Sequence, residues 1–308
     1  MNKPKIVITG AAGFIGSALS NSLIEKYDVF AIDNLTSGSW ARLDPSIVRV
    51  QMDLASASLH DLKVVFAGAE KICHLAAVKL NNPTRNSNQM LKTNILGTRN
   101  IFEAAGMSGV RKVLFTSSLY AYGSTGPAIM SEQDIPFPTT LYGMTKLIGE
   151  QMLKDAGEKY DFDVVIPRLF FIYGPGQFTD GGYKSIIVRN CEQLNLGFPA
   201  TINGDGNQAL DYVFIDDCIE ALNSLLEKKV TGVLNLSSGI PQSVNTIVET
   251  LISFSSVSKT EYRDADWTAG SIRFGANERI QSLAGWTPMT SFSEGLKQTW
   301  EYYATAQR

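Results

Sequence analysis

Two residues, Tyr142 and Lys146, have the types and spacing needed for acid–base chemistry on a hydroxyl group. They stand four positions apart, so a helix would present both on one face. A tyrosine has an ordinary pKa near ~10 and is a poor base at neutral pH. A neighbouring ammonium favours the phenolate and makes it usable for removing a hydroxyl proton. Because this spacing also occurs by chance on exposed helices, the pair needs support from the rest of the chain.

A glycine-rich loop near the N-terminus supplies part of that support. Gly10, Gly13 and Gly16 lie between an apolar run and a helical pattern, a context in which such glycines bring backbone N–H groups close to a pyrophosphate. Asp33 ends the next apolar run, where a carboxylate can bind an adenosine ribose and repel a 2′-phosphate. No Arg or Lys follows it until Arg42. The sequence therefore predicts a dinucleotide site that prefers NAD to NADP.

The elements that position these residues are short apolar strands alternating with longer helical stretches. Continuous apolar strands with crossover helices are typical of a parallel sheet covered on both faces, so we expect an α/β, doubly wound fold of the Rossmann type. The expected strands are 5–9, 27–32, 47–51, 71–74, 113–116, 164–166 and 233–236. The expected helices include one that starts near Phe14 and the stretches 88–107 and 142–159. We expect 211–226 to form a strand followed by a helix.

After Arg168 the elements become shorter and turns more frequent, as in Gly204-Asp205-Gly206. We expect residues 1–176 to form the NAD-binding domain, with 207–236 returning to it. Residues 177–206 and 237–308 would form a smaller, interleaved C-terminal lobe that covers the substrate.

Taken together and in order, these motifs resemble the extended short-chain dehydrogenase/reductase family, and more narrowly its NAD-dependent nucleotide-sugar epimerase/dehydratase branch. The resemblance covers nearly the whole chain. The motifs that carry it are the loop 9–16, the run Asp33 to Gly38, Asp53-Leu54, His74-Leu75-Ala76-Ala77, Asn94, Thr116-Ser117-Ser118, Tyr142-xxx-Lys146, Tyr173-Gly174-Pro175 and the run Asp211 to Asp217.

The resemblance implies roles for individual residues of this chain. Ser118 would hydrogen-bond the reacting sugar oxygen, Tyr142 would be the base, and Lys146 would also bind the nicotinamide ribose. The implied cofactor-binding set is Gly10, Gly13, Phe14, Ile15 and Gly16 at the pyrophosphate, Asp33, Asn34, Ser37 and Gly38 at the adenosine ribose, Asp53 and Leu54 at the adenine, and Leu75, Ala76, Ala77 and Lys79 on the nicotinamide side, with Asn94, Tyr142 and Lys146. We interpret His74 as a packed histidine rather than a general base, and Cys73 as unreactive.

The reaction implied is an epimerisation. Dehydratases of this branch carry an Asp-Glu pair where this chain has Leu119 and Tyr120, so the acid that water elimination needs is missing. A 4-epimerase, acting on a UDP-glucose or UDP-N-acetylglucosamine type of substrate through a transient 4-keto sugar, needs only Ser118, Tyr142, Lys146 and NAD. Two alternatives stay open: an NAD(P)H-dependent reductase of 4-keto-6-deoxy nucleotide sugars, and a non-catalytic NAD-sensing binding protein.

Two departures concern the substrate's diphosphate. Phe171 stands where the family usually has Asn, and Leu210 where it usually has Arg. Arg263 resembles the remaining phosphate-binding arginine, and Lys184 is a candidate replacement for the missing groups. Counting forward by the family's spacing, Gly270 would leave room beside the sugar's C2 group for an N-acetyl substituent.

Composition excludes several classes of protein. The 308 residues carry a formal net charge of −3, which gives no electrostatic reason to expect nucleic acid or anionic membrane as a partner. Three cysteines have no metal-ligand spacing, so no metal site is predicted and a reducing compartment is favoured. We expect a cytoplasmic protein without a signal sequence or membrane span. The stretches 88–107 and 142–159 resemble the helix pair that family members use to form a homodimer.

Overall fold

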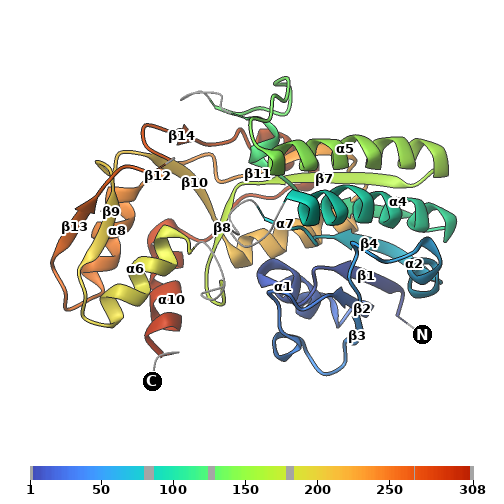
Figure 1. Cartoon of the computed structure of the whole chain (residues 1–308), viewed down its shortest axis with the longest axis horizontal. Helices are drawn as coiled ribbons and strands as arrows, with labels where there is room; N and C mark the ends of the chain where they lie inside the picture. The colour runs from blue at the N-terminus through green and yellow to red at the C-terminus, as the bar shows by residue number, and fades with distance from the viewer. Residues whose placement is uncertain (1–2, 80–86, 124–128, 178–183, 267, 306–308) are drawn as a thin grey trace.

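A parallel sheet of eight strands organises the N-terminal part of the chain in the computed structural model, which describes residues 3–79, 87–123, 129–177, 184–266 and 268–305 (Figure 1). The strands run in the order β11-β7-β5-β4-β1-β2-β3, with β6 also paired to β7. Their bounds are β1 (Lys5–Thr9), β2 (Asp28–Asp33), β3 (Val48–Gln51), β4 (Ala69–His74), β5 (Lys112–Phe115), β6 (Ser117–Ser118), β7 (Asp163–Leu169) and β11 (Gly232–Leu236).

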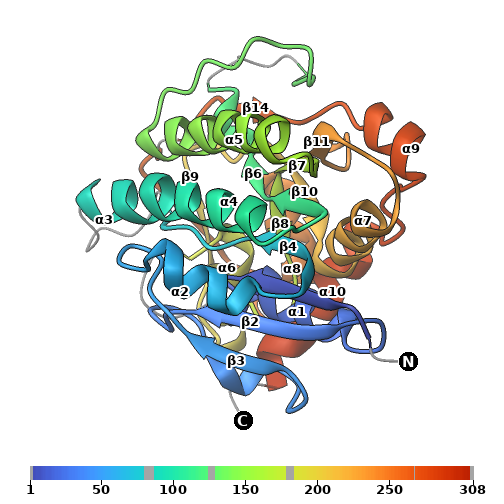
Figure 2. The ribbon, with the colours of Figure 1, turned by 90° about the vertical axis from the view of Figure 1, so that its right-hand side faces the viewer.

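Helices cover both faces of this sheet. On one face α2 packs on α4 and α4 on α5, and on the other α1 packs on α7 (Figure 2). Their bounds are α1 (Phe14–Leu23), α2 (Leu59–Phe66), α4 (Thr98–Met107), α5 (Leu141–Tyr160) and α7 (Ile215–Glu227). This arrangement confirms the predicted doubly wound α/β fold.

The alternation of side chains along β1 explains why both faces must be covered. Ile6 and Ile8 are fully buried in the core that includes α1 and α7, whereas Val7 is fully buried in the core that includes α4 and α5. Successive strand residues point to opposite faces. An uninterrupted apolar strand therefore requires helices on both sides.

The expected helix 88–107 is interrupted in its middle. It consists of α3 (Ser87–Leu91), a π-helical segment η2 (Lys92–Gly97) and α4. A π turn inside a helix commonly marks a functional position, and η2 carries Asn94. Periodicity of apolar residues does not distinguish such a turn from ordinary helix.

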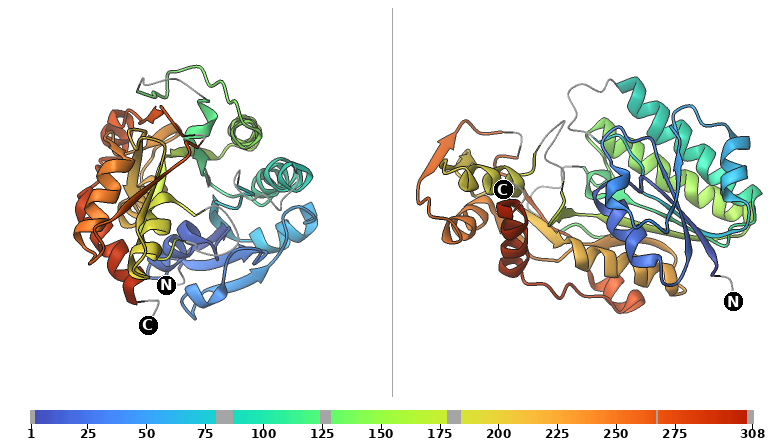
Figure 3. Two further views of the ribbon diagram at one scale, coloured as in Figure 1. Left: turned by 60° about the vertical axis from the view of Figure 1, so that its left-hand side comes forward. Right: turned by 90° about the horizontal axis from the view of Figure 1, so that it is seen from below.

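The second part of the chain builds a separate, smaller lobe (Figure 3, yellow to red). Its main sheet centres on β10, which pairs with β8, β12 and β14, and β13 pairs with β9. The remaining elements are β8 (Phe171–Tyr173), α6 (Ile186–Asn195), β9 (Ala200–Asn203), β10 (Ala209–Phe214), β12 (Pro241–Ser243), α8 (Val244–Ser253), β13 (Thr260–Arg263), β14 (Ile272–Arg273), α9 (Glu278–Ala284) and α10 (Phe292–Thr305), with short turns η1 (Trp40–Arg42) and η3 (Leu119–Ala121).

The segment 207–236, expected to return as a whole to the first domain, divides between the two parts. Strand β10 belongs to the small sheet, whereas α7 packs on α1 and β11 pairs with β7. The chain also leaves the large sheet at Leu169 and joins the small one at Phe171. The division lies within these connections because β8 and β10 hydrogen-bond to each other rather than to the large sheet. Within the described residues, no helix is long and apolar enough to cross a membrane.

Candidate active site

The loop between β1 and α1 has the close backbone contacts that require glycine. Gly10 has a φ of +69°, and a Cβ there would lie 2.7 Å from the backbone nitrogen of Ala76. A Cβ on Gly16 would lie 2.0 Å from the carbonyl oxygen of Gly10. Gly13 is the N-cap of α1 and offers no side-chain cap. Backbone N–H groups at the start of this helix, with Phe14 and Ile15 following, are therefore arranged to bind an anion.

Asp33 joins this loop to the end of β2. Its two carboxylate oxygens accept hydrogen bonds from the backbone N–H groups of Ala12, at 3.0 Å, and Leu35, at 2.8 Å. Gly38 lies against the same loop, since a Cβ there would be 2.7 Å from the carbonyl carbon of Ala12. Asp33 thus holds the glycine loop in place, a contact that the sequence did not predict.

The other residues expected around the adenosine lie beside Asp33. Asn34 accepts hydrogen bonds from Thr36 and donates one to Asp53, with a separation of 3.4 Å between Nδ2 and Oδ1. Ser37 is exposed, and Leu54 is buried under η2, where Gly97 packs on its carbonyl.

The segment after β4, which carries Leu75, Ala76, Ala77 and the exposed Lys79, is held by side chains from remote elements. Asn94 accepts a hydrogen bond from the Val78 N–H (2.8 Å) and donates to the Val78 carbonyl (3.0 Å). It also donates to the Thr145 hydroxyl on α5 (3.1 Å). Asn94 therefore fixes the backbone on the expected nicotinamide side and ties it to the helix that carries Tyr142.

Ser118, Tyr142 and Lys146 come together at the carboxyl end of β5 and β6. Lys146 donates a hydrogen bond to the Thr116 carbonyl at 2.8 Å, and its Nζ lies 5.8 Å from the centre of the Tyr142 ring. The Ser118 hydroxyl lies beside the Tyr142 phenol and acts to lower its pKa. The start of α5 approaches this point closely, because a Cβ on Gly143 would lie 2.2 Å from the carbonyl oxygen of Tyr120.

Burial shifts the two titratable groups in directions that matter for catalysis. Burial, against the opposing charge of Glu150 and together with the charge of Lys79, lowers the pKa of Lys146 to about 7. Burial and the neighbouring Tyr120 raise the pKa of Tyr142 above its usual range, and the Ser118 hydroxyl opposes this. Tyr142 therefore needs an additional positive charge nearby to become a phenolate at neutral pH.

A buried ion pair beneath these residues was not predicted. Arg168 donates hydrogen bonds of 2.9 and 2.7 Å to the two carboxylate oxygens of Glu150, and both side chains are at most 3% exposed. Ser117, next to Ser118, also donates to Glu150. The position of Glu150, four residues after Lys146, indicates only that the two share a helix face; its contact with Arg168 on β7 depends on tertiary packing.

His74 and Cys73 are packing residues. Both ring nitrogens of His74 hydrogen-bond to hydroxyl groups, of Thr9 at 2.6 Å and Thr98 at 2.9 Å, and burial lowers its pKa to about 3. Burial raises the pKa of Cys73 to about 12. Neither side chain is a base or nucleophile at neutral pH, in agreement with the sequence interpretation. No group of three or more His, Cys, Asp or Glu in the described segments could hold a metal ion.

A pocket extends from this centre into the small lobe. Tyr120 lies at its wall, and the Tyr120 ring centre is 6.0 Å from that of Tyr142. Phe171, which the sequence assigned to substrate binding, lines the pocket, as does Leu210. Arg189 on α6 and Gln208 before β10 also line it, and the sequence analysis missed both.

The other expected substrate residues lie elsewhere. Lys184 forms an ion pair with Glu192 at 2.6 Å, and Arg263 is exposed beside Glu261. Gly270 is exposed, with a φ of +70°, and a Cβ there would meet open space. None of these three lines the pocket.

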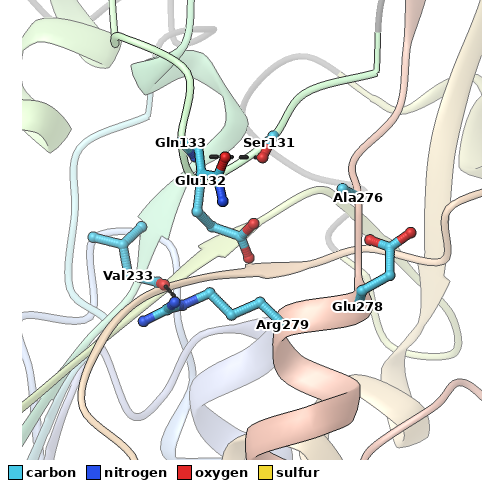
Figure 4. A pocket seen from close by; sticks show the side chains of 7 residues that line it. All are labelled: Ser131, Glu132, Gln133, Val233, Ala276, Glu278 and Arg279. Carbon is cyan, nitrogen blue, oxygen red and sulfur yellow. Dashed lines mark hydrogen bonds between the residues drawn. The ribbon is translucent and has the colours of Figure 1, made fainter.

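A second hollow of about 370 Å³ lies between the segment 131–133 and the start of α9 (Figure 4). Glu132, Glu278 and Arg279 face it, and Arg279 donates a hydrogen bond to the Val233 carbonyl. None of the catalytic or loop residues lines this hollow. The first pocket, by contrast, includes Tyr120, whose ring lies 6.0 Å from that of Tyr142, so we locate the active site beside it.

The glycine loop fits a dinucleotide on structural grounds. At the glycines where a Cβ would collide with neighbouring backbone, the chain segments approach each other closely. An anionic group can bind at the start of α1, where no side-chain cap competes for the backbone N–H groups. The carboxylate of Asp33 at the end of β2 suits ribose hydroxyls.

Comparisons with known proteins agree with this geometry. Residues 6–237 match the family described as the NAD dependent epimerase/dehydratase family. A UDP-glucose 4-epimerase of Mycolicibacterium smegmatis is 30% identical over 310 residues, covering 97% of this chain and 98% of that protein. A solved UDP-glucose 4-epimerase of Thermotoga maritima, bound to UDP-glucose, has a TM-score of 0.92 at 28% identity and covers 99% of this chain and 100% of its own.

A UDP-glucuronic acid 4-epimerase of Bacillus cereus, solved with UDP-glucuronic acid and NAD, has a TM-score of 0.86 at 28% identity, covering 98% of this chain and 99% of its own. The match to the family extends over three quarters of the sequence and includes the glycine loop, Ser118, Tyr142 and Lys146. The cofactor is NAD, and the protein belongs to the NAD-dependent epimerase/dehydratase family of extended short-chain dehydrogenase/reductase enzymes.

Proposed function

We propose that this protein is a nucleotide-sugar 4-epimerase that acts through a transient 4-keto sugar, with UDP-glucose or UDP-N-acetylglucosamine as the type of substrate. The observation that carries the proposal is the meeting of Ser118, Tyr142 and Lys146 next to Tyr120, which lines a pocket in the small lobe. The named 4-epimerases among the similar proteins support it.

The three residues divide the work on the sugar hydroxyl. Ser118 donates a hydrogen bond to the reacting oxygen and orients it toward Tyr142. Tyr142 removes the hydroxyl proton on oxidation and returns it on reduction. Lys146 stabilises the phenolate through its charge. NAD supplies the hydride acceptor and then the hydride donor, and the keto sugar turns over between the two steps.

The surroundings of Ser118 favour epimerisation over elimination of water. The two positions after it hold Leu119, which is 1% exposed, and Tyr120, which faces the pocket. Neither carries the carboxyl group that would protonate a leaving hydroxyl. Asp33 favours a bound NAD that is recycled within one turnover, rather than NADPH consumed from solution.

The expected cofactor residues form one continuous surface in this proposal. The loop from Gly10 to Gly16 would hold the pyrophosphate, Asp33 and Asp53 would hold the adenosine, and the segment from Leu75 to Lys79 would hold the nicotinamide. Asn94 supports the cofactor through the backbone of Val78 rather than by direct contact.

We further propose a homodimer formed through α4 and α5. Apolar side chains on and beside this pair are exposed, including Met144 (44%) and Ile148 (42%) on α5 and Leu96 (56%) on η2, which leads into α4. Burying them against a second copy would make a four-helix bundle across a two-fold axis. The three buried, free cysteines fit a cytoplasmic location.

The deciding experiment starts from the purified protein. Denaturing it should release NAD(H), and incubating the native enzyme with UDP-glucose or UDP-N-acetylglucosamine should yield the galacto epimer by NMR. If neither sugar is epimerised while a 4-keto-6-deoxy nucleotide sugar is reduced, the enzyme is the alternative reductase. If NAD binds and no nucleotide sugar turns over, the protein is a cofactor-binding sensor.

A further inference from the structure

The pocket in the small lobe has mostly apolar walls. Phe171, Leu210, Tyr212 and Val244 line it, and the Phe171 and Tyr212 rings lie 5.8 Å apart. In such surroundings a charge interacts strongly with a partner and poorly with water. The polar and charged side chains that also line this pocket therefore determine which ligand can bind.

Two charged side chains stand among the described residues that line this pocket, Arg189 and Asp266. Asp266 accepts hydrogen bonds from the Thr268 N–H and hydroxyl at one oxygen and from Asn203 at the other. These bonds and the charge of Arg189 lower the pKa of Asp266. The Asp266 carboxylate is anchored by its own loop, and Arg189 is the cationic side chain among the described residues of this wall.

Gln208 adds a second requirement. Its side-chain nitrogen donates to the Asn203 carbonyl at 2.9 Å, while its oxygen, in a residue only 3% exposed, has no hydrogen-bond partner among the residues that the structure describes. A buried acceptor without a donor is uncommon in proteins. A ligand that supplies an N–H or O–H group there would satisfy it.

The remaining basic residues near this lobe are directed elsewhere. Lys184 is paired with Glu192, and Arg263 is exposed beside Glu261. Arg273 lies over the Tyr120 ring at 5.8 Å and is in register with Leu210 on the neighbouring strand, so it stands at the end of the pocket nearest Tyr142. Arg273 is therefore the alternative candidate for holding an anion.

We infer that Arg189 binds the diphosphate of the substrate and that the Gln208 oxygen accepts a hydrogen bond from its nucleoside. This inference rests on the proposed nucleotide-sugar function and assigns its diphosphate contact to a residue of α6. A nucleoside diphosphate matches both requirements, since it combines an anionic group with N–H and O–H donors on the base and ribose. Arginine suits the role because its fork of donors matches phosphate oxygens.

The test measures binding without turnover. UDP, dTDP, CDP and GDP are titrated into the NAD-loaded wild-type enzyme by calorimetry. The diphosphate that binds best is then compared across the variants, together with its nucleoside, whose binding is measured by ligand-observed NMR. Arg189→Gln should weaken the diphosphate about tenfold or more and leave the nucleoside unchanged, because only the charge-assisted contact is lost. Gln208→Met should weaken the diphosphate and its nucleoside by the same factor.

Lys184→Gln and Arg263→Gln are matched controls and should bind like the wild type. Wild-type affinity in Arg189→Gln, or a larger loss in Arg273→Gln, overturns the assignment. An equal loss of diphosphate and nucleoside in Arg189→Gln also overturns it, because the residue would then shape the pocket rather than hold phosphate. If the wild type binds none of the four diphosphates, the proposed function itself fails.

Discussion

The glycine loop and the substrate pocket differ in how their residues reach their places. Gly10 and Gly16 act through their own backbone, within a loop whose two ends are fixed by β1 and α1. Arg189 on α6 and Gln208 just before β10 both line the pocket only because the small lobe brings these separate elements to one cavity. The first kind of site is encoded locally and the second by tertiary packing. Changes in the two regions should therefore have different consequences.

The largest effect is expected for Tyr142→Phe, at the junction of the two regions. Turnover should fall about 10²–10⁴-fold because the base is removed. NAD affinity should stay close to that of the wild type, since the glycine loop is untouched. Single-turnover kinetics and a cofactor titration measure the two quantities separately. Ser118→Ala, which removes one aligned donor, should cost about 2–4 kcal/mol in the barrier. Near wild-type rates in Tyr142→Phe would contradict the mechanism.

A second prediction concerns the buried pair that links the catalytic helix to β7. Glu150→Gln leaves Arg168 without its anion and should lower the free energy of unfolding by about 3–5 kcal/mol. Glu150 acts to raise the pKa of Lys146, so its loss lowers that pKa further. Lys146 then loses its proton at lower pH, and the alkaline limb of the rate profile should move to lower pH.

The control for this change is Glu103→Gln. Glu103 pairs with Lys159 at 2.9 Å on the helices α4 and α5, away from the catalytic residues, and Lys159 is 56% exposed. Its removal should leave the pH profile unchanged. A rate profile of Glu150→Gln that matches the wild type would limit the role of the pair to packing. Should the single variant not fold, the double variant Glu150→Gln with Arg168→Met removes both charges and allows the same measurement.

The parts of the site that could be predicted from the sequence are the parts that are encoded locally. The strand ends, the loop 10–16 and the pair Tyr142 and Lys146 are specified by short-range spacing, and the structure places them as expected. Asn94 was identified, but its contact with Val78 depends on the π turn of η2, which periodicity does not indicate. In the small lobe, strand pairing such as Leu210 with Arg273 joins segments 63 positions apart.

A third prediction tests the cofactor half through Asp33. Its carboxylate is anchored to the N–H groups of Ala12 and Leu35, so it cannot turn away from an added 2′-phosphate. NAD(H) should bind more tightly than NADP(H) by a few kcal/mol, since the negative charge of the carboxylate would face the negative charge of the phosphate. Fluorescence titration of both cofactors measures the difference. Equal affinity for NADPH would instead favour the reductase.

The smallest effect is expected for Gly270, which the family's spacing had placed beside the sugar. A Cβ there meets open space, and the residue does not line the pocket. Gly270→Tyr should therefore leave the ratio of rates on N-acetylated and unmodified sugars unchanged. Gly270 has a positive φ of +70°, which side chains with a Cβ rarely adopt, so the substitution should cost about 1 kcal/mol of stability. A thermal melt measures this loss. Gly16→Ala is the contrast: its Cβ would lie 2.0 Å from the Gly10 carbonyl oxygen, so NAD binding should fail. Loss of N-acetyl tolerance in Gly270→Tyr would show that this turn reaches the substrate after all.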